Sequence, residues 1–417
     1  MTTVLVTDGQ TRSALAIARS LGRHGVRVVC GESTRLATTF ASKHVDERFV
    51  YPDPRVSPDA FISTLLRYLQ THDIDVLLPV DHESTYLINK HRGLLAEHTL
   101  VPVAGADKFD RLVQKDLVMQ QAARLGIPHP RTVYPKSADE AVELAAVLTF
   151  PVVVKPRTSA GAKGVQYVDD PSSLRQAYHT ASQWGPNPIV QEQIPQEGRG
   201  MGAAFLRWDG EIIARFEYQR LREFPPSGGA STLRESIHDD RLFEAGKALL
   251  EDVDWQGVAM VEFKNDPRTD TPQLLEVNPR FWGSLHLPYR SGVEFPWLLV
   301  QCALGDAPDP VLTYPAGDRC RYLLPGDLIN LFSRRDMDAL REFFPLVEPG
   351  VSFDILDRSD PLPAVAQLLV MAREAVTYVS SSSSSKQTAP PPTMSIPDHG
   401  DPESSSDDRT TITPPDV

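Results

Sequence analysis

The chain has 417 residues, of which 41% are hydrophobic and 23% are charged, as in a globular protein of two or three domains. Its formal net charge of −13 argues against a nucleic-acid binder, which needs a basic surface, and its three distant cysteines have neither metal nor redox spacing. No signal peptide or membrane span is recognisable, so we expect a soluble cytoplasmic protein that binds neither nucleic acid nor membranes.

Strands and helices alternate along residues 1–106. Apolar strands are expected at 4–7, 26–29 and 76–80, and helices are expected at 13–24 and 60–70. This alternation predicts a parallel sheet with helices on both faces, as in a Rossmann-like α/β domain. The turn after the first strand lacks the G-x-G-x-x-G pattern of a dinucleotide site, but the strand ends of such a domain can still hold a substrate.

The pattern changes after residue 106. Helical patterns at 109–125 and 137–148, and a helix capped by Asp239 or Asp240, alternate with short strands. Asp209-Gly210 lies between two apolar strands and is the strongest hairpin signal in the chain. Because hairpins join its strands, this region predicts largely antiparallel sheets.

Two parts follow at the C-terminal end. Residues 311–380 are expected to form an extension that packs on the preceding domain. Residues 381–417 are rich in Ser, Pro, Thr and Asp and have almost no aliphatic side chains. Such a segment cannot bury enough apolar surface to fold, so we expect a disordered acidic tail.

Two acidic strands carry the main chemical signal. Glu262 lies in the apolar segment Val-Glu-Phe, and Leu-Leu-Glu-Val-Asn-Pro-Arg contains Glu276, Asn278 and Arg280 on one face. A buried carboxylate needs a compensating charge, for which a bound cation is the usual source. Two Glu and one Asn offer hard oxygen ligands for Mg²⁺ beside nucleotide phosphates, with Arg280 next to them. The alternative is a pair of ordinary strands whose acids face water.

Several residues before these strands have patterns suited to a nucleotide. Lys155 ends the strand Val-Val-Val, and the small residues of loop 157–165 would let backbone N–H groups approach phosphates. The extended segment 191–194 offers backbone donors and acceptors for an adenine edge. Taken singly, the loop is also compatible with a plain hairpin, the segment with a strand end, and Lys115 with a surface lysine.

In this order and spacing, the residues resemble the ATP-grasp superfamily. GIPHPRT at 126–132, FPVVVKP at 150–156 and LLEVNPRFWGS at 274–284 are similar to its recurrent segments, and the resemblance covers about residues 1–310. The similarity is greatest to the carboxylate–amine/thiol ligase-like branch, which is related in pattern to carbamoyl-phosphate synthase.

The resemblance implies a division of the fold. Residues 1–106 would be a pre-ATP-grasp α/β domain, and residues 107–310 would be a two-lobed ATP-grasp domain with antiparallel sheets. The small lobe would lie at about 115–190 and the large lobe at about 191–310.

The resemblance also implies a role for each candidate residue. Arg280 and Lys155 would be catalytic, with Arg280 facing the γ-phosphate and the acyl phosphate. Mg²⁺ or Mn²⁺ would be held by Glu262, Glu276 and Asn278. The ATP-binding residues would be Lys115, Lys155, Ser159, Gly161, Gly164, Glu192, Gln193, Ile194 and Glu197. Within this set the 192–194 backbone would hold adenine, and Glu197 is the candidate for the ribose.

The implied function is an ATP-dependent, ADP-forming carbon–nitrogen ligase. It would activate a small-molecule carboxylate as an acyl phosphate for attack by an amine or similar nucleophile, and similar proteins are commonly homodimers. Two alternatives stay open: a kinase or a bicarbonate- or carbamate-activating enzyme of the same superfamily, and a non-catalytic ATP-binding regulatory protein. Arg220, Arg222 and Arg234 are either contacts for an acidic substrate or solvated surface arginines.

Overall fold

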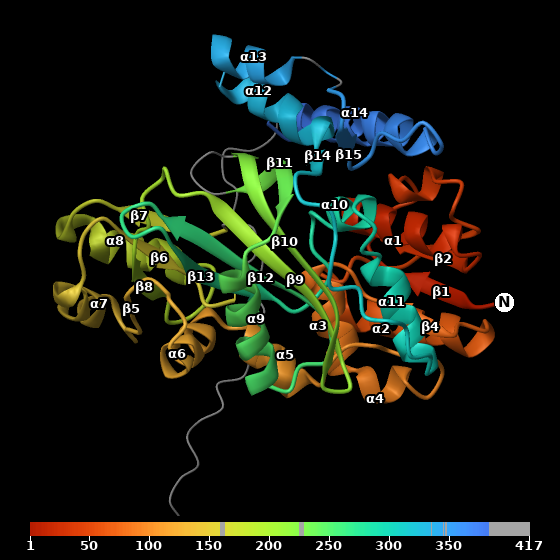
Figure 1. Ribbon diagram of the computed structural model, residues 1–417, viewed down its shortest axis with the longest axis horizontal. Helices are drawn as coiled ribbons and strands as arrows, with labels where there is room; N and C mark the ends of the chain where they lie inside the picture. Colours follow the sequence, from red (N-terminus) through yellow and green to blue (C-terminus); the bar gives the residue numbers. More distant parts are fainter. Residues whose placement is uncertain (159–162, 225–228, 335, 345, 347, 383–417) are drawn as a thin grey trace, which may run out of the picture.

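The computed structural model describes residues 1–158, 163–224, 229–334, 336–344, 346 and 348–382. These residues form three β-sheets with helices packed around them. In Figure 1 the parallel sheet of the N-terminal domain and a smaller antiparallel sheet lie at opposite ends of the molecule, with the largest sheet between them. None of the described helices combines the length and apolar character needed to cross a membrane.

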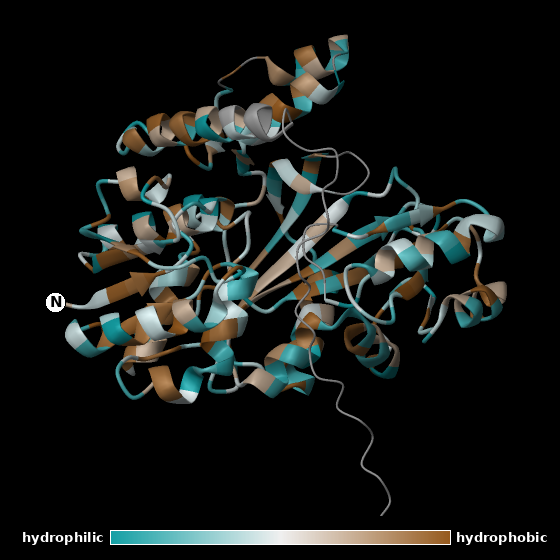
Figure 2. Ribbon diagram, turned by 180° about the vertical axis from the view of Figure 1, so that it is seen from behind, coloured by the Kyte–Doolittle hydropathy of each residue, from teal (hydrophilic) through white to brown (hydrophobic). Residues whose placement is uncertain are grey.

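The N-terminal domain has a four-stranded parallel sheet in the order β3-β2-β1-β4. Its elements are β1 (Thr3–Val6), α1 (Arg12–Arg23), β2 (Arg27–Glu32), the 3₁₀ helix η1 (Thr39–Ala41), β3 (Glu47–Val50), α2 (Pro58–Thr71), β4 (Val76–Leu78), α3 (His82–Lys90) and α4 (Arg92–Leu95). Val4 packs in one core cluster with residues of α1, whereas Leu5 packs in another with residues of α2. Both faces of the sheet are therefore covered, and its strands appear apolar in Figure 2.

The small lobe has a four-stranded antiparallel sheet in the order β5-β8-β6-β7. Its elements, with the helices that lead into it, are α5 (Ala106–Val113), α6 (Lys115–Leu125), β5 (Thr132–Val133), α7 (Ala138–Leu144), the 3₁₀ helix η2 (Ala145–Val147), β6 (Val152–Lys155), β7 (Gln166–Val168), α8 (Pro171–Ser182) and β8 (Ile189–Glu192). The Ser137 side chain caps α7 by accepting from the N–H of Glu140, as its sequence pattern predicts.

The central sheet has seven strands in the order β13-β12-β9-β10-β11-β14-β15. Its strands are β9 (Gly200–Trp208), β10 (Glu211–Phe224), β11 (Ala230–Ile237), β12 (Gly257–Asp266), β13 (Thr271–Asn278), β14 (Arg319–Arg321) and β15 (Val351–Phe353). All neighbours are antiparallel except β14 and β15. At the β9–β10 turn, Asp209 and Gly210 have φ angles of 48° and 87°, the left-handed conformation that the hairpin signal predicts.

The remaining helices cover both faces of the central sheet and form the C-terminal extension. They are α9 (Asp240–Asp252), α10 (His286–Arg290), α11 (Phe295–Leu304), η3 (Leu323–Asp327), α12 (Leu328–Arg334), α13 (Met337–Phe343) and α14 (Leu362–Ser382). Phe205 of β9 packs on the α9 side of the sheet, whereas Leu206 faces the cluster shared with α11 and the N-terminal domain. This alternation places the N-terminal domain against one face of the central sheet.

The fold class expected from the sequence is confirmed, with one local difference. The helical pattern at 109–125, which predicted one or two helices, forms two, because the extended backbone of Gln114 ends α5 and starts α6. Helix α14 continues to Ser382, two residues into the predicted tail, and the rest of that tail lies outside the described residues. Strands β14 and β15 belong to the expected extension and join the central sheet, whereas the domain boundaries stay a prediction.

A buried polar cluster joins the N-terminal domain, the central sheet and the extension. Asp354 follows β15, is fully buried, and pairs with both Arg234 of β11 and Arg12 of α1. Arg19 of α1 pairs with Asp360 at 3.0 Å and donates to the backbone oxygens of Asp354 and Ile355. Burial alone would raise the pKa of Asp354, but Arg234 and Arg12 hold it well below its usual range.

We expect Asp354→Asn to lower the free energy of unfolding by about 3–5 kcal/mol, because two guanidinium groups would lose their buried carboxylate. Urea unfolding at neutral pH measures this loss. The matched control is Asp338→Asn, in an exposed pair with Arg341, where the expected change is within about 0.5 kcal/mol. A loss below about 1 kcal/mol for Asp354→Asn would contradict a structural role for the buried cluster.

Candidate active site

A cleft of about 350 Å³ opens between the small lobe and the central sheet, and α1 of the N-terminal domain also contributes to it. Its charged lining comprises six cationic side chains and four acidic ones, namely Arg12, Lys115, Lys155, Arg220, Lys264 and Arg280 against Glu192, Glu223, Glu262 and Glu276. The cleft therefore carries two excess positive charges in a chain whose net charge is −13. Such a cleft attracts an anion of the charge of MgATP²⁻.

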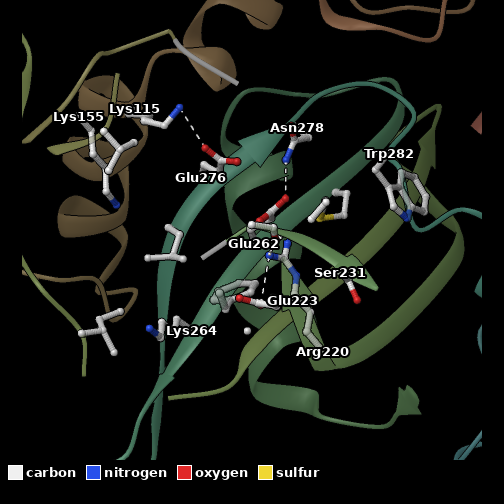
Figure 3. A pocket seen from close by; sticks show the side chains of 18 of the residues that line it. Lys115, Lys155, Arg220, Glu223, Ser231, Glu262, Lys264, Glu276, Asn278 and Trp282 are labelled. Atoms are coloured by element: carbon white, nitrogen blue, oxygen red, sulfur yellow. Dashed lines mark hydrogen bonds and ion pairs between the residues drawn. The ribbon is translucent and has the colours of Figure 1, made fainter. Parts of the chain in front are cut away.

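The two acidic strands place their polar side chains on the same face of the sheet. β12 and β13 pair so that Glu262 lies opposite Glu276, and Met260 lies opposite Asn278. The amide nitrogen of Asn278 donates to Glu262 Oε1 at 3.1 Å, and Arg280 Nη2 donates to Asn278 Oδ1 at 3.0 Å. The four predicted residues thus lie together in the cleft, and Figure 3 shows Glu262, Glu276 and Asn278 among them. The alternative of acids facing open water is excluded.

The set suits a hard cation that also binds a nucleotide. Within the described part of the chain, no group of three or more His, Cys, Asp or Glu side chains could hold a metal ion. Here two carboxylates and one amide leave coordination positions for phosphate oxygens, which is how Mg²⁺ is commonly bound in nucleotide sites. The residues fit the expected metal, and their role as ligands stays a prediction.

The protein itself supplies charges that compensate the two carboxylates, which the sequence argument had assigned to a bound cation. Lys115 Nζ lies 3.0 Å from Glu276 Oε2, and Arg220 Nη2 lies 2.5 Å from Glu262 Oε2 (Figure 3). Burial would raise the pKa of Glu276, but Lys115 and Lys155 together lower it. Burial raises the pKa of Glu262 despite the neighbouring Arg220. The two carboxylates thus differ in how firmly they hold a proton.

The two predicted phosphate-binding lysines approach this site from the other wall of the cleft. Lys115 is the first residue of α6 and is only 7% exposed, so the surface-lysine alternative is excluded. Lys155 ends β6, and its Nζ donates to Gln191 Oε1 of β8 at 2.8 Å. Burial lowers the pKa of Lys155 to about 8, with Glu276 opposing that effect. In Figure 3 both lysines lie on the same side of the cleft, and a dashed line joins Lys115 to Glu276.

The segment predicted to hold adenine lines the cleft at the end of β8. The N–H of Glu192 donates to Arg131 O and that of Gln193 to Pro151 O. The Glu192 carboxylate accepts from the backbone N–H of Thr149 at 2.8 Å. The N–H of buried Ile194, by contrast, has no hydrogen-bond partner among the described residues. Ile194 is therefore the backbone donor still available to a base.

Four further predicted residues lie away from the described cleft or outside the described residues. Ser159 and Gly161 lie outside the described residues. Gly164 has a φ of 74°, and an added Cβ would lie 2.6 Å from Trp184 and 2.7 Å from Pro156, so this turn requires glycine. Glu197 lines a separate hollow of about 310 Å³ rather than the cleft, and its assignment to the ribose stays a prediction.

Sequence reasoning missed three charged residues of the cleft, Arg12, Glu223 and Lys264, and it misread Arg222 and Arg234, which lie outside the cleft. Lys264 and Glu223 line the cleft. Lys264 could have been found, because it follows Glu262 by two residues on the same strand face. Glu223 could not, because β10 has register shifts around Arg222 that interrupt the alternation. Arg222 pairs with Asp327 at 2.6 Å and buried Arg234 pairs with Asp354, so both hold the extension and only Arg220 reaches the cleft.

The fold and the cleft together define the class of protein. A cleft between two largely antiparallel sheets, with two lysines on one wall and a Glu–Glu–Asn set on the other, is the arrangement that the motifs of the ATP-grasp resemblance predict. Two family models match this part of the chain: "Carbamoyl-phosphate synthase L chain, ATP binding domain" over residues 114–195, and "ATP-grasp in the biosynthetic pathway with Ter operon" over residues 197–320. The chain belongs to the ATP-grasp superfamily and is an enzyme of its ligase class.

Sequence and fold comparisons with individual characterised proteins are consistent with membership of this superfamily. The chain is 24% identical over 298 residues to the D-aspartate ligase of Enterococcus faecium, covering 65% of this chain and 70% of the relative. It is 27% identical over 183 residues to the C-terminal section of the carbamoyl phosphate synthase large chain of Methanopyrus kandleri, covering 42% and 34%. The biotin carboxylase of Campylobacter jejuni shares the fold, with a TM-score of 0.64 at 17% identity over 76% of this chain and 74% of that one.

We expect Lys155 in the folded protein to be acylated by acetic anhydride with a midpoint near pH 8, because only the neutral amine reacts and burial lowers its pKa to about 8. Labelling at a series of pH values, followed by peptide mass spectrometry, measures the midpoint. MgATP should protect this lysine. A midpoint near the usual lysine value of about 10.4 would contradict the lowered pKa.

Proposed function

We propose that the protein is an ATP- and Mg²⁺-dependent ligase that activates a carboxylate as an acyl phosphate for attack by an amine. The supporting observation is the convergence of Lys115, Lys155 and Arg280 with the Glu262–Glu276–Asn278 set in one positively charged cleft. No part of this set resembles a nucleophile activated by a general base. It is suited instead to positioning phosphates and neutralising their charge.

The chemistry solves a specific problem, because a carboxylate does not react with an amine at neutral pH. A carboxylate oxygen would attack the γ-phosphorus of ATP, the bond between that phosphorus and the β–γ bridging oxygen would break, and ADP would leave. The acyl phosphate would then be attacked at its carbonyl carbon by a neutral amine. The carbon–nitrogen bond forms, inorganic phosphate leaves, and the amine proton is lost to give the amide.

The residues of the chain would bind and orient the reactants. Lys115 and Lys155 would contact phosphate oxygens, and Ile194 N–H would bind the adenine edge. Arg280 would face the transferred phosphoryl group, where its planar fork suits two oxygen atoms. Mg²⁺ held by Glu262, Glu276 and Asn278 would neutralise charge on the phosphates. The two lobes would exclude water, which otherwise hydrolyses an acyl phosphate.

The relatives support an ATP-dependent ligase in general, and two of them are named for joining amino acids, whereas the carbamoyl phosphate synthase and biotin carboxylase leave the bicarbonate- or carbamate-activating alternative open. The D-aspartate ligase, matched over 70% of its length, is named for joining an amino acid. The solved structures include an L-amino acid ligase of Bacillus licheniformis with a TM-score of 0.58 at 17% identity, which supports a shared fold. Neither similarity identifies the substrates of this chain.

Substitution of the cleft residues should abolish turnover. We expect Lys155→Ala and Glu276→Gln each to lower ADP release at least about 100-fold, because each removes a charge that acts on the transferred phosphate. A coupled ADP assay with Mg²⁺ and a panel of carboxylates and amines measures the rate. The matched control is Lys136→Ala, an exposed lysine outside the cleft, which should retain turnover. Retained turnover in folded Lys155→Ala or Glu276→Gln would overturn the assignment.

The products distinguish the proposed reaction from the alternatives. We expect inorganic phosphate and a new amide in equal amounts with ADP, measured by phosphate assay and mass spectrometry. Chelation of divalent cations should stop the reaction, and Mg²⁺ or Mn²⁺ should restore it, because the metal ligands are hard oxygen atoms. A stable phosphorylated product would indicate a kinase. Binding of ATP without ADP formation across the panel would indicate a regulatory protein.

A further inference from the structure

The cleft extends beyond the residues that the proposed function uses. At the end away from the two lysines it is lined by Arg12, Ser231, Trp282, Gly283 and Ser284, which we call the Arg12 subsite. Figure 3 shows Trp282 and Ser231 on the opposite side of the Glu262–Asn278 pair from Lys115 and Lys155. No acidic side chain belongs to this set, so its chemistry differs from that of the metal-binding candidates.

Arg12 reaches this end from the N-terminal domain. It is the first residue of α1 and follows β1, at the carboxyl edge of the parallel sheet where α/β domains commonly bind ligands. Its guanidinium lies over the ring of Tyr322 at 4.1 Å, and its side chain is 11% exposed. Nη1 donates to Asp354 at 2.8 Å and to Ser231 O at 3.2 Å. The guanidinium is thus held from one side.

The other two guanidinium nitrogens of Arg12 lie against Gly283. A Cβ added at Gly283 would be 2.9 Å from Nη2 and 3.1 Å from Nε, so a side chain there would displace the guanidinium. Among the described residues, the hydrogen bonds of Arg12 all use Nη1. The Nε and Nη2 atoms, which carry three N–H donors, therefore remain for a ligand in the cleft.

The charge around Arg12 is incompletely balanced. Asp354 is shared by Arg12 and Arg234, so one carboxylate serves two guanidinium groups. Arg234 is wholly buried, whereas Arg12 borders the cleft. The surplus positive charge is consequently presented to the cleft by Arg12, where an anionic group can neutralise it.

Trp282 adds a second, independent indication of a ligand. It is 1% exposed, lines the cleft, and packs edge-on against Phe295 with ring centroids 5.1 Å apart. Its indole Nε1 has no hydrogen-bond partner among the described residues. A buried donor without an acceptor is unfavourable, so an acceptor atom from a bound molecule is expected here.

We propose that the Arg12 subsite binds a carboxylate of the substrates, distinct from the carboxylate that receives the phosphoryl group. This inference rests on the proposed function, because it concerns the same cleft. The Nε and Nη2 atoms of Arg12, with three N–H donors between them, suit the oxygen atoms of one carboxylate, and the Trp282 indole N–H in the same lining offers a further donor. That carboxylate belongs either to a dicarboxylic acid that is activated at its other end, or to an amino acid that acts as the amine.

Binding to the full-length protein distinguishes the two sources. Calorimetry with Mg²⁺ and the non-hydrolysable analogue AMP-PNP would compare matched pairs: succinate with butyrate, glutarate with valerate, and β-alanine with propylamine. We expect the carboxylate-bearing member of at least one pair to bind at least about 10-fold more tightly, as a charge-assisted hydrogen bond contributes about 1.5–3 kcal/mol. Tighter binding of succinate than butyrate, or of glutarate than valerate, indicates a dicarboxylic substrate. Tighter binding of β-alanine than propylamine indicates an amino-acid acceptor. Equal affinity within every pair overturns the proposal.

Variants test which residues produce the preference. Arg12→Gln should abolish the preference for the carboxylate-bearing ligand in whichever pair shows it. Trp282→Phe, which keeps the ring but removes the N–H donor, should reduce it several-fold. Arg12 also contacts Asp354, so Trp282→Phe keeps the test decisive if Arg12→Gln fails to fold. The matched control is Arg23→Gln, on the same helix but outside the cleft, which should keep the preference. A preference unchanged in both folded Arg12→Gln and Trp282→Phe overturns the proposal.

Turnover separates failure of this proposal from failure of the proposed function. Hydroxylamine traps an acyl phosphate as a hydroxamate without a specific amine, so hydroxamate formation with Mg-ATP reports activation of each acid alone. Hydroxamate formed without any preference within the pairs, together with equal binding, overturns only the Arg12 subsite. Absence of AMP-PNP binding overturns the proposed function itself, and the pairs can then be compared in the absence of nucleotide.

Discussion

The pairing of β12 with β13 is the constraint on which the rest of the site depends, because it fixes Glu262 opposite Glu276. Two carboxylates so close together require compensating charge. Arg220 supplies it from the same sheet, and Lys115 supplies it from the small lobe, so one electrostatic requirement links both walls of the cleft. Lys155 and Arg280 then add the positive charge that makes the cleft suitable for MgATP²⁻.

The same type of interaction organises the opposite end of the cleft. Asp354 draws Arg12 and Arg234 together and thereby connects the N-terminal domain, the central sheet and the extension. The cluster has a structural role, yet it also fixes Arg12 at the border of the cleft beside Gly283. Stability and ligand binding are consequently coupled at Asp354, since a change there would alter both the docking of the extension and the position of Arg12.

The sequence predicted those features that depend on local rules. Strand alternation placed Glu276, Asn278 and Arg280 together, and Asp209-Gly210 marked its hairpin correctly. It could not predict features that depend on contacts between distant segments. Arg12 lies 342 residues from its partner Asp354, so no local pattern relates them. The register shifts in β10 likewise hid Glu223, because alternation fails where a strand bulges.

Pulsed electron paramagnetic resonance with Mn²⁺ can measure whether the two acidic strands hold a divalent cation against a nucleotide. With AMP-PNP present, bound Mn²⁺ should show coupling to ³¹P nuclei of the nucleotide. This signal should be lost in a folded Glu262→Gln, Glu276→Gln double variant, because the two negative charges that attract the cation are gone and only neutral amide oxygens remain. Mn²⁺ that binds equally well in that variant, or that shows no coupling to phosphorus in the unaltered protein, would contradict the account.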